Sequence, residues 1–421
     1  MATSSTSSSD QNHSPDPDQP FLARVFKAFQ YPDFRLMWFG SCTSSIGTWM
    51  QNLAQPWVIL QITNSPFMLG LDLFLGQIPI FLFSLIGGVV ADRVERRNLL
   101  LMSQVVQMTC AFVLTVLFAF HRVHVWHIMT LSFLAGTAQS FGGPAYSALV
   151  PTLVKKEDLP NAIALNSIQF NLARVIGPML GGWALYYGGA VWCFGLNGLS
   201  FVAVIITLLI VRTRFTPKKT GESILDSMKN GIGFVRQQAA MEGLIVLAFC
   251  MTLLAFPLLG FMPVFAKDVL HGTPKTLTIL LSCSGGGSVC GALIVASMGR
   301  LKHQGRAALL MLVLLGGLIT AFALSRFLFL SAALVFISGA ALMGVFATIT
   351  SLVQLITPDN MRGRVMSVYN VAFRGGMPFG SLLVGWLGRS FTTPTVLAWN
   401  GVLLALLGLY FLIVQRRVAA L

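Results

Sequence analysis

The chain has 421 residues, of which 55% are hydrophobic and only 10% are charged, whereas an average soluble chain carries about 25% charged residues. The apolar residues fall in repeated runs of about 20 or more, each long enough to span a bilayer core of about 30 Å. These proportions exclude a soluble protein. The net charge of +14 could indicate nucleic-acid binding, but the basic residues form no patch interleaved with aromatic residues. They lie between the apolar runs, which indicates membrane orientation and no nucleic-acid partner.

The six cysteines all lie inside apolar runs, and none has metal-ligand spacing with a histidine partner. We interpret them as small packing residues, so the sequence predicts no metal site and no cofactor. Residues 1–20 are rich in Ser, Asp and Pro and contain no apolar core. This composition predicts a disordered cytoplasmic tail and no cleavable signal peptide.

Six apolar runs follow a short amphipathic segment at 21–30, which is expected to lie on the membrane surface. The predicted spans are 36–61, 67–91, 98–120, 125–150, 161–187 and 191–211. The first span is unusually polar. A polar stripe inside lipid must face protein or water, and this stripe contains Ser44, Thr48, Asn52 and Gln55.

A polar, basic linker at 212–242 separates these spans from a second set and contains an amphipathic segment at 224–235. The second set of predicted spans is 243–266, 276–298, 307–325, 327–356, 365–388 and 395–414. Residues 415–421 are expected to form a second cytoplasmic tail. The sequence therefore predicts an all-α integral membrane protein with twelve transmembrane helices, in two groups at 21–211 and 243–414.

The distribution of basic residues predicts the orientation of these spans. The termini and the turns after even-numbered spans hold 21 of the 28 Lys and Arg residues. This asymmetry places both termini in the cytoplasm. The opposite turns hold five basic residues, which are Arg122, Lys267, Lys275, Arg326 and Arg389.

The turn after the second span carries a dense charge motif, Gly88-x3-Asp92-Arg93-x2-Arg96-Arg97. The spacing resembles the signature loop of the major facilitator superfamily (MFS), whose pattern is G-x3-D-[RK]-x-G-R-[RK]. The chain departs from that pattern only at Glu95, where Gly is usual. The DRxER variant is typical of the subgroup that contains the enterobactin exporter and related bacterial efflux proteins.

This resemblance implies a role for the motif. A tight inside-positive turn would account for the arginines alone, but Asp92 opposes that rule and needs another explanation. A carboxylate at this point could lie against a helix N-terminus, where free N–H groups favour an anion. In the superfamily the matching Asp lies against the eleventh span, so the resemblance implies a gate latch formed by Gly88, Asp92, Arg93, Arg96 and Arg97.

The two groups of spans also repeat. Ser167, Arg174 and Pro178 in the fifth span recur as Ser367, Arg374 and Pro378 in the eleventh, with a constant offset of 200 residues. Parallel six-helix repeats joined by a basic central segment are the MFS plan, with the substrate site between the halves near the midplane. The resemblance implies two pseudo-symmetric six-helix bundles and covers residues 21–417.

The fifth span carries a second motif, Gly177-Pro178-x2-Gly181-Gly182, which resembles the span-5 signature of exporter-type members. Gly177 and Gly181 share a helix face and allow close packing, and Pro178 permits a bend. Pro378 occupies the equivalent place in the second half. The motif is either an ordinary kinked packing helix or, as the resemblance implies, an interface hinge that favours export.

Arg174 and Arg374 are charged residues inside spans, and such a residue costs at least about 2.5 kcal/mol on insertion, so it normally faces a partner or cavity. Arg174 shares a polar face with Asn171. Two interpretations remain open for the arginines. They bind a carbonyl or pair between the halves, or they contact an anionic substrate or favour the ionised form of a nearby acid.

Asp72 is the one acid that we place well inside a span, about 10 Å from its end. A carboxyl group buried in the membrane can bind and release a proton near neutral pH. Asp72 is therefore a candidate proton site, and Asn52, Gln55 and Asn171 are candidate polar neighbours of the substrate or proton. Alternatively, Asp72 pairs with an arginine or contacts water.

The chain contains no GxxxxGK[ST] and no HExxH, so we expect no enzyme and an ion gradient, most simply of protons, as the energy source. The sequence predicts a monomeric secondary transporter of the bacterial plasma (inner) membrane, working by alternating access. Its expected substrate is a small amphiphilic or anionic compound of the siderophore or drug class, and the motifs favour export. A lysophospholipid or other metabolite transporter of the same fold, or a non-transporting membrane sensor or enzyme, are the alternatives.

Overall fold

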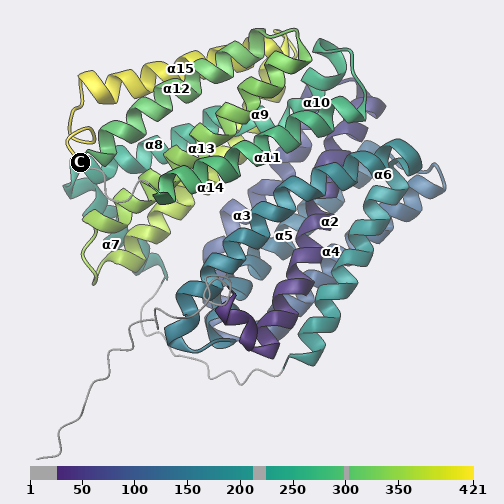
Figure 1. Cartoon of the computed structure of the whole chain (residues 1–421), viewed down its shortest axis with the longest axis horizontal. Coiled ribbons are helices and arrows are strands. Elements are labelled where there is room, and N and C mark those ends of the chain that lie inside the picture. Colours follow the sequence, from purple (N-terminus) through teal and green to yellow (C-terminus); the bar gives the residue numbers. More distant parts are fainter. Residues whose placement is uncertain (1–25, 212–223, 298–302) are drawn as a thin grey trace, which may run out of the picture.

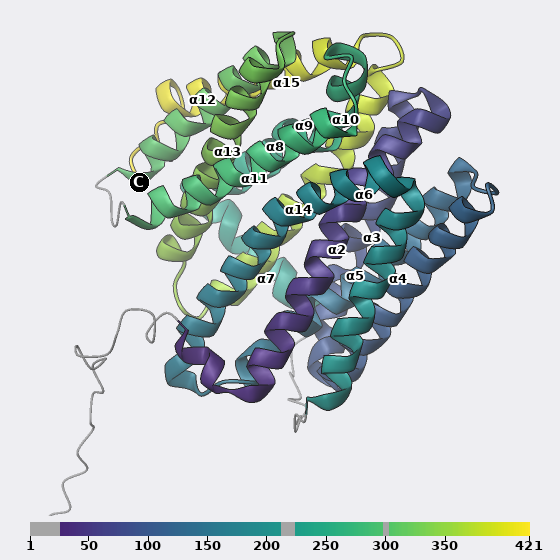
Figure 2. The ribbon, with the colours of Figure 1, turned by 45° about the vertical axis from the view of Figure 1, so that its right-hand side comes forward.

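The computed structural model describes residues 26–211, 224–297 and 303–421, and these residues form helices and turns without a β-strand. The predicted tail at 1–20 and the first part of the linker, 212–223, lie outside the described residues. Figures 1 and 2 show two groups of long helices side by side, coloured purple to teal and teal to yellow. We call residues 26–211 the first half and residues 224–421 the second half.

The first half begins with a short 3-10 helix, η1 (Lys27–Gln30), and contains two more, η2 (Val150–Thr152) and η3 (Lys156–Asp158). Its long helices are α2 (Pro32–Thr63), α3 (Pro66–Arg93), α4 (Arg96–Ala119), α5 (Val125–Leu149) and α6 (Leu159–Ile210). The turn between α2 and α3 shows why the chain reverses where it does. Asn64 adopts a left-handed conformation after α2, Ser65 caps the next helix, and Pro66 starts it.

Helix α6 contains a chain reversal at Gly189, whose φ of 66° and ψ of −163° suit only glycine. The first part of α6 runs parallel to α2, because residues 165–181 contact residues 38–50 of α2 with both numbers rising together. The second part of α6 runs antiparallel to α2, because Gly40 contacts Thr207 and Gly47 contacts Ser200. The two parts of α6 therefore run antiparallel on either side of α2, and they correspond to the fifth and sixth predicted spans.

The second half begins with the amphipathic helix α7 (Ile224–Gln237), in the part of the linker where the sequence predicts it. A 31-residue helical run, 239–269, follows and is interrupted at two prolines. It consists of α8 (Ala239–Ala255), α9 (Pro257–Gly260), α10 (Met262–Val264) and the π-helical turn η4 (Phe265–Val269). The run starts four residues before the expected boundary at 243, because the exposed Glu242 in its first turn does not stop the helix.

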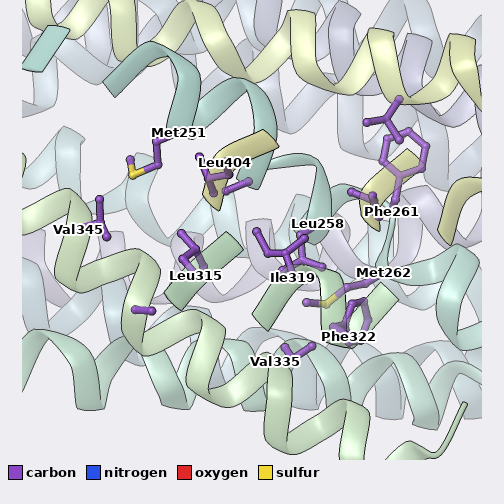
Figure 3. Close-up of a cluster of buried hydrophobic side chains, with 14 of the residues drawn as sticks. Met251, Leu258, Phe261, Met262, Leu315, Ile319, Phe322, Val335, Val345 and Leu404 are labelled. Atoms are coloured by element: carbon purple, nitrogen blue, oxygen red, sulfur yellow. The ribbon is translucent and has the colours of Figure 1, made fainter. Parts of the chain in front are cut away.

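Five helices complete the second half: α11 (Pro274–Ser297), α12 (Gln304–Leu324), α13 (Leu328–Ile356), α14 (Arg362–Leu387) and α15 (Thr393–Ile413). Figure 3 shows the buried apolar cluster among them, in which Leu315, Ile319 and Leu404 lie between neighbouring helices. The predicted tail at 415–421 packs onto this half, because Val418 is completely buried.

Eight helical segments in the described residues are long and apolar enough to cross a membrane, with α6 counted once. Helices α2, α5 and α14 contain 32, 25 and 26 residues and are also long enough to cross, but they are more polar. Large aromatic side chains are exposed at one end of the helices, among them Trp126, Tyr187, Trp192 and Phe327. Such residues are enriched where a membrane protein meets the lipid–water interface.

Because consecutive helices alternate in direction, their turns fall at two ends. We call the end with the turns at 94–95, 150–158 and 357–361 the basic end. The opposite end has the turns at 64–65, 120–124, 188–190, 270–273, 325–327 and 388–392, and we call it the far end. The two halves approach each other mainly through α3 with α14 and α6 with α11.

The segment before α2 is held to the first half at the basic end by Asp158, which is 6% exposed in its side chain. Asp158 accepts from Lys27 Nζ at 2.8 Å, Tyr31 Oη at 2.8 Å and Gln30 Nε2 at 2.9 Å. Burial opposes ionisation of Asp158, but the hydrogen bonds and the charge of Lys27 outweigh it and lower its pKa. The same hydrogen bond and charge raise the pKa of Lys27.

Candidate functional site

A polar cavity of about 190 Å³ lies inside the first half, between α2, α3, α4, α5 and the second part of α6. Its walls carry several amide side chains, which a purely structural helix crossing would not need. Three of the sequence-predicted site residues line it, and these are Asn52, Gln55 and Asp72. The structure therefore brings together polar residues from the first two predicted spans.

Asp72 is 2% exposed and is the centre of the polar contacts in this cavity. Ser132 Oγ donates to one carboxylate oxygen at 2.6 Å, and Gln55 Nε2 donates to the other at 2.7 Å. Gln55 Nε2 also lies 2.8 Å from Ser132 Oγ. No Lys or Arg lines the cavity within the described residues. Within the described residues, hydrogen bonds rather than an ion pair therefore satisfy the buried carboxyl group.

The contacts of Asp72 continue through a chain of amides to the second part of α6. Gln51 Nε2 donates to Gln55 Oε1 at 3.0 Å, and Asn197 Nδ2 donates to Gln51 Oε1 at 2.5 Å. The chain connects four helices, because Ser132 belongs to α5. A change in the protonation of Asp72 would alter hydrogen bonds on α2, α3, α5 and α6 together.

Sequence reasoning missed three members of this network. Gln51 lies one turn before Gln55 on the same helix, so its spacing could have identified it. Ser132 and Asn197 lie alone on other helices, and nothing in one sequence indicates that they point toward Asp72. The predicted neighbour Asn171 is on α6 outside the cavity, where its amide donates to the carbonyl of Ser167 at 2.8 Å.

The two intramembrane arginines lie away from Asp72. Neither Arg174 nor Arg374 lines the polar cavity. The guanidinium carbon of Arg174 lies 5.7 Å from the centre of the Trp49 ring on α2, a cation–π distance. Arg374 is exposed on α14. The candidate residues thus lie in separate places, with the acid site within the first half and the arginines on helices that contact the other half.

The glycine motif of the fifth predicted span packs against two different helices. A side chain added at Gly177 would meet Trp49, and one added at Gly181 would lie 2.9 Å from the Cα of Met50, both on α2. Gly182 faces Thr278 on α11 in the other half. Pro178 and Pro378 are both buried within their helices. The motif thus joins α2 to the interface between the halves.

Hydrogen bonds from the charged turn at the basic end join it to helices of the first half. Arg96 Nη1 donates to the carbonyl of Ala148 at 2.9 Å, and Arg97 donates to the carbonyl of Leu208. These carbonyls lie at the C-terminal ends of α5 and α6, where cations are favoured. Asp92 lies 3.6 Å from Arg96 and is 46% exposed in its side chain.

The latch between Asp92 and the start of α14 stays a prediction, and the ion pair that Asp92 makes among the described residues is with Arg96. Within the described ranges, a side chain added at Gly88 on α3 or at Gly363 on α14 would meet no atom within 4 Å. Arg93 is exposed. The described parts of the two halves therefore leave open space around both sides of the expected latch.

The far end is closed by direct backbone contact between the halves. A Cβ added at Gly70 on α3 would lie 2.6 Å from the carbonyl oxygen of Ser381 and 2.9 Å from the Cα of Gly385, both on α14. Small residues allow this approach. The halves are thus in direct contact at the far end, whereas Gly88 and Gly363 at the basic end face open space.

The chain consists of two groups of membrane-spanning helices that meet at one end and enclose a buried polar site. This is the arrangement of a secondary transporter of the MFS class. The chain belongs to the transmembrane secretion effector family of that superfamily, whose family model matches residues 23–420.

The comparisons with individual proteins agree with this family. The chain is 28% identical over 403 residues to the enterobactin exporter EntS of Citrobacter koseri, covering 94% of each chain. It is also 28% identical over 407 residues to EntS of Salmonella typhimurium, covering 94% of this chain and 95% of the relative. These relatives are transporters, and the chain is not an enzyme.

Solved structures share the fold at low sequence identity. A POT family transporter in complex with 5-aminolevulinic acid has a TM-score of 0.74 and 12% identity, covering 91% of this chain and 96% of its own. A bacterial homologue of the iron transporter ferroportin in an inward-facing state has a TM-score of 0.70 and 15% identity, covering 93% and 99%. These likenesses establish the fold alone.

Proposed function

We propose that this chain is an exporter of the bacterial plasma membrane that crosses it twelve times, with both termini in the cytoplasm. The observation that carries the proposal is the whole-length similarity to exporters. Helices α2, α5 and α14 and the two parts of α6 supply the crossings beyond the most apolar helices. The excess of Lys and Arg at the basic end supports its cytoplasmic placement.

Alternating access explains why the halves are in backbone contact at the far end while Gly88 and Gly363 at the basic end face open space. With the basic end in the cytoplasm, the described conformation is closed to the outside and separated at the cytoplasmic side. In the opposite conformation, Asp92 would reach the N-terminus of α14 and form the latch with Arg93. Arg96 and Arg97 would keep their carbonyl partners, because these lie within the first half.

Protons are the proposed coupling ion, with Asp72 as their site. The carboxyl group is buried, hydrogen-bonded by neutral groups, and adjacent to a polar cavity. Burial disfavours an unpaired charge. Because the chain of amides connects Asp72 to Gln51 and Gln55 on α2, binding or release of a proton would act on the helix whose Trp49 ring lies beside the candidate substrate contact, Arg174.

The proposed substrate is a small amphiphilic or anionic compound of the siderophore or drug class. Arg174 and Arg374 supply positive charge on α6 and α14, two helices that contact the opposite half. Trp49 adds an aromatic surface beside Arg174. A planar anionic compound suits this combination of guanidinium and aromatic groups.

The test is siderophore release from a bacterial host that makes enterobactin and lacks its own exporter. The wild-type chain is compared with Asp92→Ala and with Glu242→Ala, an exposed acid at the basic end outside the proposed latch. All variants are brought to equal membrane abundance. We expect release with the wild type and Glu242→Ala and strongly reduced release with Asp92→Ala.

Equal release with Asp92→Ala would contradict the latch but leave the export function intact. No release with the wild type would refute the siderophore assignment. The same strains would then be tested for efflux of amphiphilic drugs and of lysophospholipids in vesicles containing only the purified chain.

A further inference from the structure

Five basic residues lie at the far end, on the side where the inside-positive rule disfavours them. Four of the five belong to the second half, and three of these four contact the first half across the interface. These residues are Lys267, Lys275 and Arg389. Their positions call for an explanation other than membrane orientation.

Lys267 in η4 holds the C-terminal end of α2. Its Nζ donates to the carbonyl of Leu60 at 3.1 Å and to Oδ1 of Asn64 at 2.6 Å. The last carbonyls of a helix have no partner within the helix and carry its negative dipole end, so a cation is favoured there. Asn64 presents its amide oxygen from the left-handed turn that ends α2, with φ of 47°.

Lys275 and Arg389 bind aromatic rings of the first half. Lys275 Nζ lies 4.1 Å from the centre of the Tyr186 ring at the end of the first part of α6. The guanidinium carbon of Arg389 lies 3.5 Å from the centre of the Phe67 ring at the start of α3. Both distances are within the range of a favourable cation–π contact.

We propose that Lys267, Lys275 and Arg389 form a three-point cationic clamp that holds the two halves together at the far end. The proposal rests on the alternating-access function proposed above. The clamp touches α2 and α3, two of the helices around the polar cavity, and the first part of α6. It therefore opposes movement of the helices that carry Gln55 and Asp72.

The chemistry of the clamp suits a closure that must repeatedly open. Its partners in the described chain are a carbonyl, an amide oxygen and two rings, and none is a carboxylate. Each contact joins a cation to a neutral group, so opening the clamp leaves no second buried charge unpaired.

The experiment measures the separation of the halves at the far end without any substrate. Spin labels are attached to Phe120→Cys in the first half and Phe329→Cys in the second, positions that are 72% and 90% exposed. The six native cysteines are replaced by alanine. Distance distributions are recorded in nanodiscs for the parent and for a triple variant with Met at the three clamp positions, since Met keeps length but removes charge.

The long-distance population relative to the short one is expected to rise at least about tenfold in the triple variant, as the loss of several charged contacts implies. Asn64→Gly removes one acceptor of Lys267 and tolerates the left-handed turn, so it should give a smaller rise. The matched control is Arg122→Met with Arg326→Met, exposed far-end arginines that have no cross-half contact within the described residues, and it should match the parent.

A triple variant with the parent distribution would overturn the clamp, as would an equal rise in the Arg122 and Arg326 control. Because the measurement needs no transported compound, its outcome is separate from the siderophore test. A failed export assay with an opened triple variant would reject the proposed substrate and retain the clamp.

Discussion

The contact of α3 with α14 at the far end allows a steric test of alternating access with Gly70→Ala. The new Cβ would lie 2.6 Å from the Ser381 carbonyl oxygen, whereas ordinary contacts begin at 3.4 Å. The helices must therefore separate by about 0.8 Å, or the contact stays strained. Overpacking of this kind costs about 1–3 kcal/mol. Since both crowded atoms belong to the other half, the cost applies to the closed conformation and not to either half alone.

An energy of about 1–3 kcal/mol shifts a two-state equilibrium by about 5–150-fold. The spin-label pair at the far end measures this shift directly. Gly317→Ala on α12 is the control, because its Cβ would meet no described atom within 4 Å. The reasoning is refuted if Gly70→Ala and Gly317→Ala give the same distance distribution.

Three further predictions concern stability and coupling. Gly316→Ala places a Cβ 2.5 Å from a carbonyl oxygen of α15, so its Tm should lie about 1–3 °C below that of the neighbouring Gly317→Ala, and equal Tm values would contradict the packing of α12 on α15. Asp72→Asn should abolish transport driven by a pH gradient in vesicles, and an unchanged pH dependence would remove Asp72 as the proton site. The lowered pKa of Asp158 stabilises the fold above the ordinary pKa of about 3.9, and the benefit disappears as pH falls through the lowered folded-state value. Asp158→Asn should therefore expose the Lys27 segment to protease at pH 7, with a difference from wild type that fades below about pH 4; equal digestion at pH 7 would rule out this role.

Much of the helical architecture could be predicted because the bilayer imposes a simple requirement. A segment that crosses about 30 Å of hydrocarbon needs about 20 apolar residues and must satisfy its own backbone hydrogen bonds. Most expected spans therefore begin and end within a few residues of the observed helices. The start of α8 at Ala239 was harder to predict, because the exposed Glu242 has the polarity of a linker residue although the helix continues through it.

The candidate acid site could be predicted only in part. Asp72 and Gln55 were identifiable because polar groups inside apolar runs are costly and need partners. Their partner Ser132 comes from another helix, and its contact depends on how α3 and α5 are rotated about their axes. One sequence carries little information on that rotation, because the small residues that permit close approach occur on many helix faces.

At both ends of the molecule, basic side chains donate hydrogen bonds to the last carbonyls of a helix, but the structural effect differs between the two ends. At the basic end, Arg96 and Arg97 bind the C-terminal carbonyls of α5 and α6 within one half. At the far end, Lys267 binds the C-terminal carbonyl of α2 across the two halves. A rigid movement of one half against the other would leave the first contacts intact and break the second. The position of a cation relative to the interface, more than its charge, therefore decides whether it stabilises a half or a conformation.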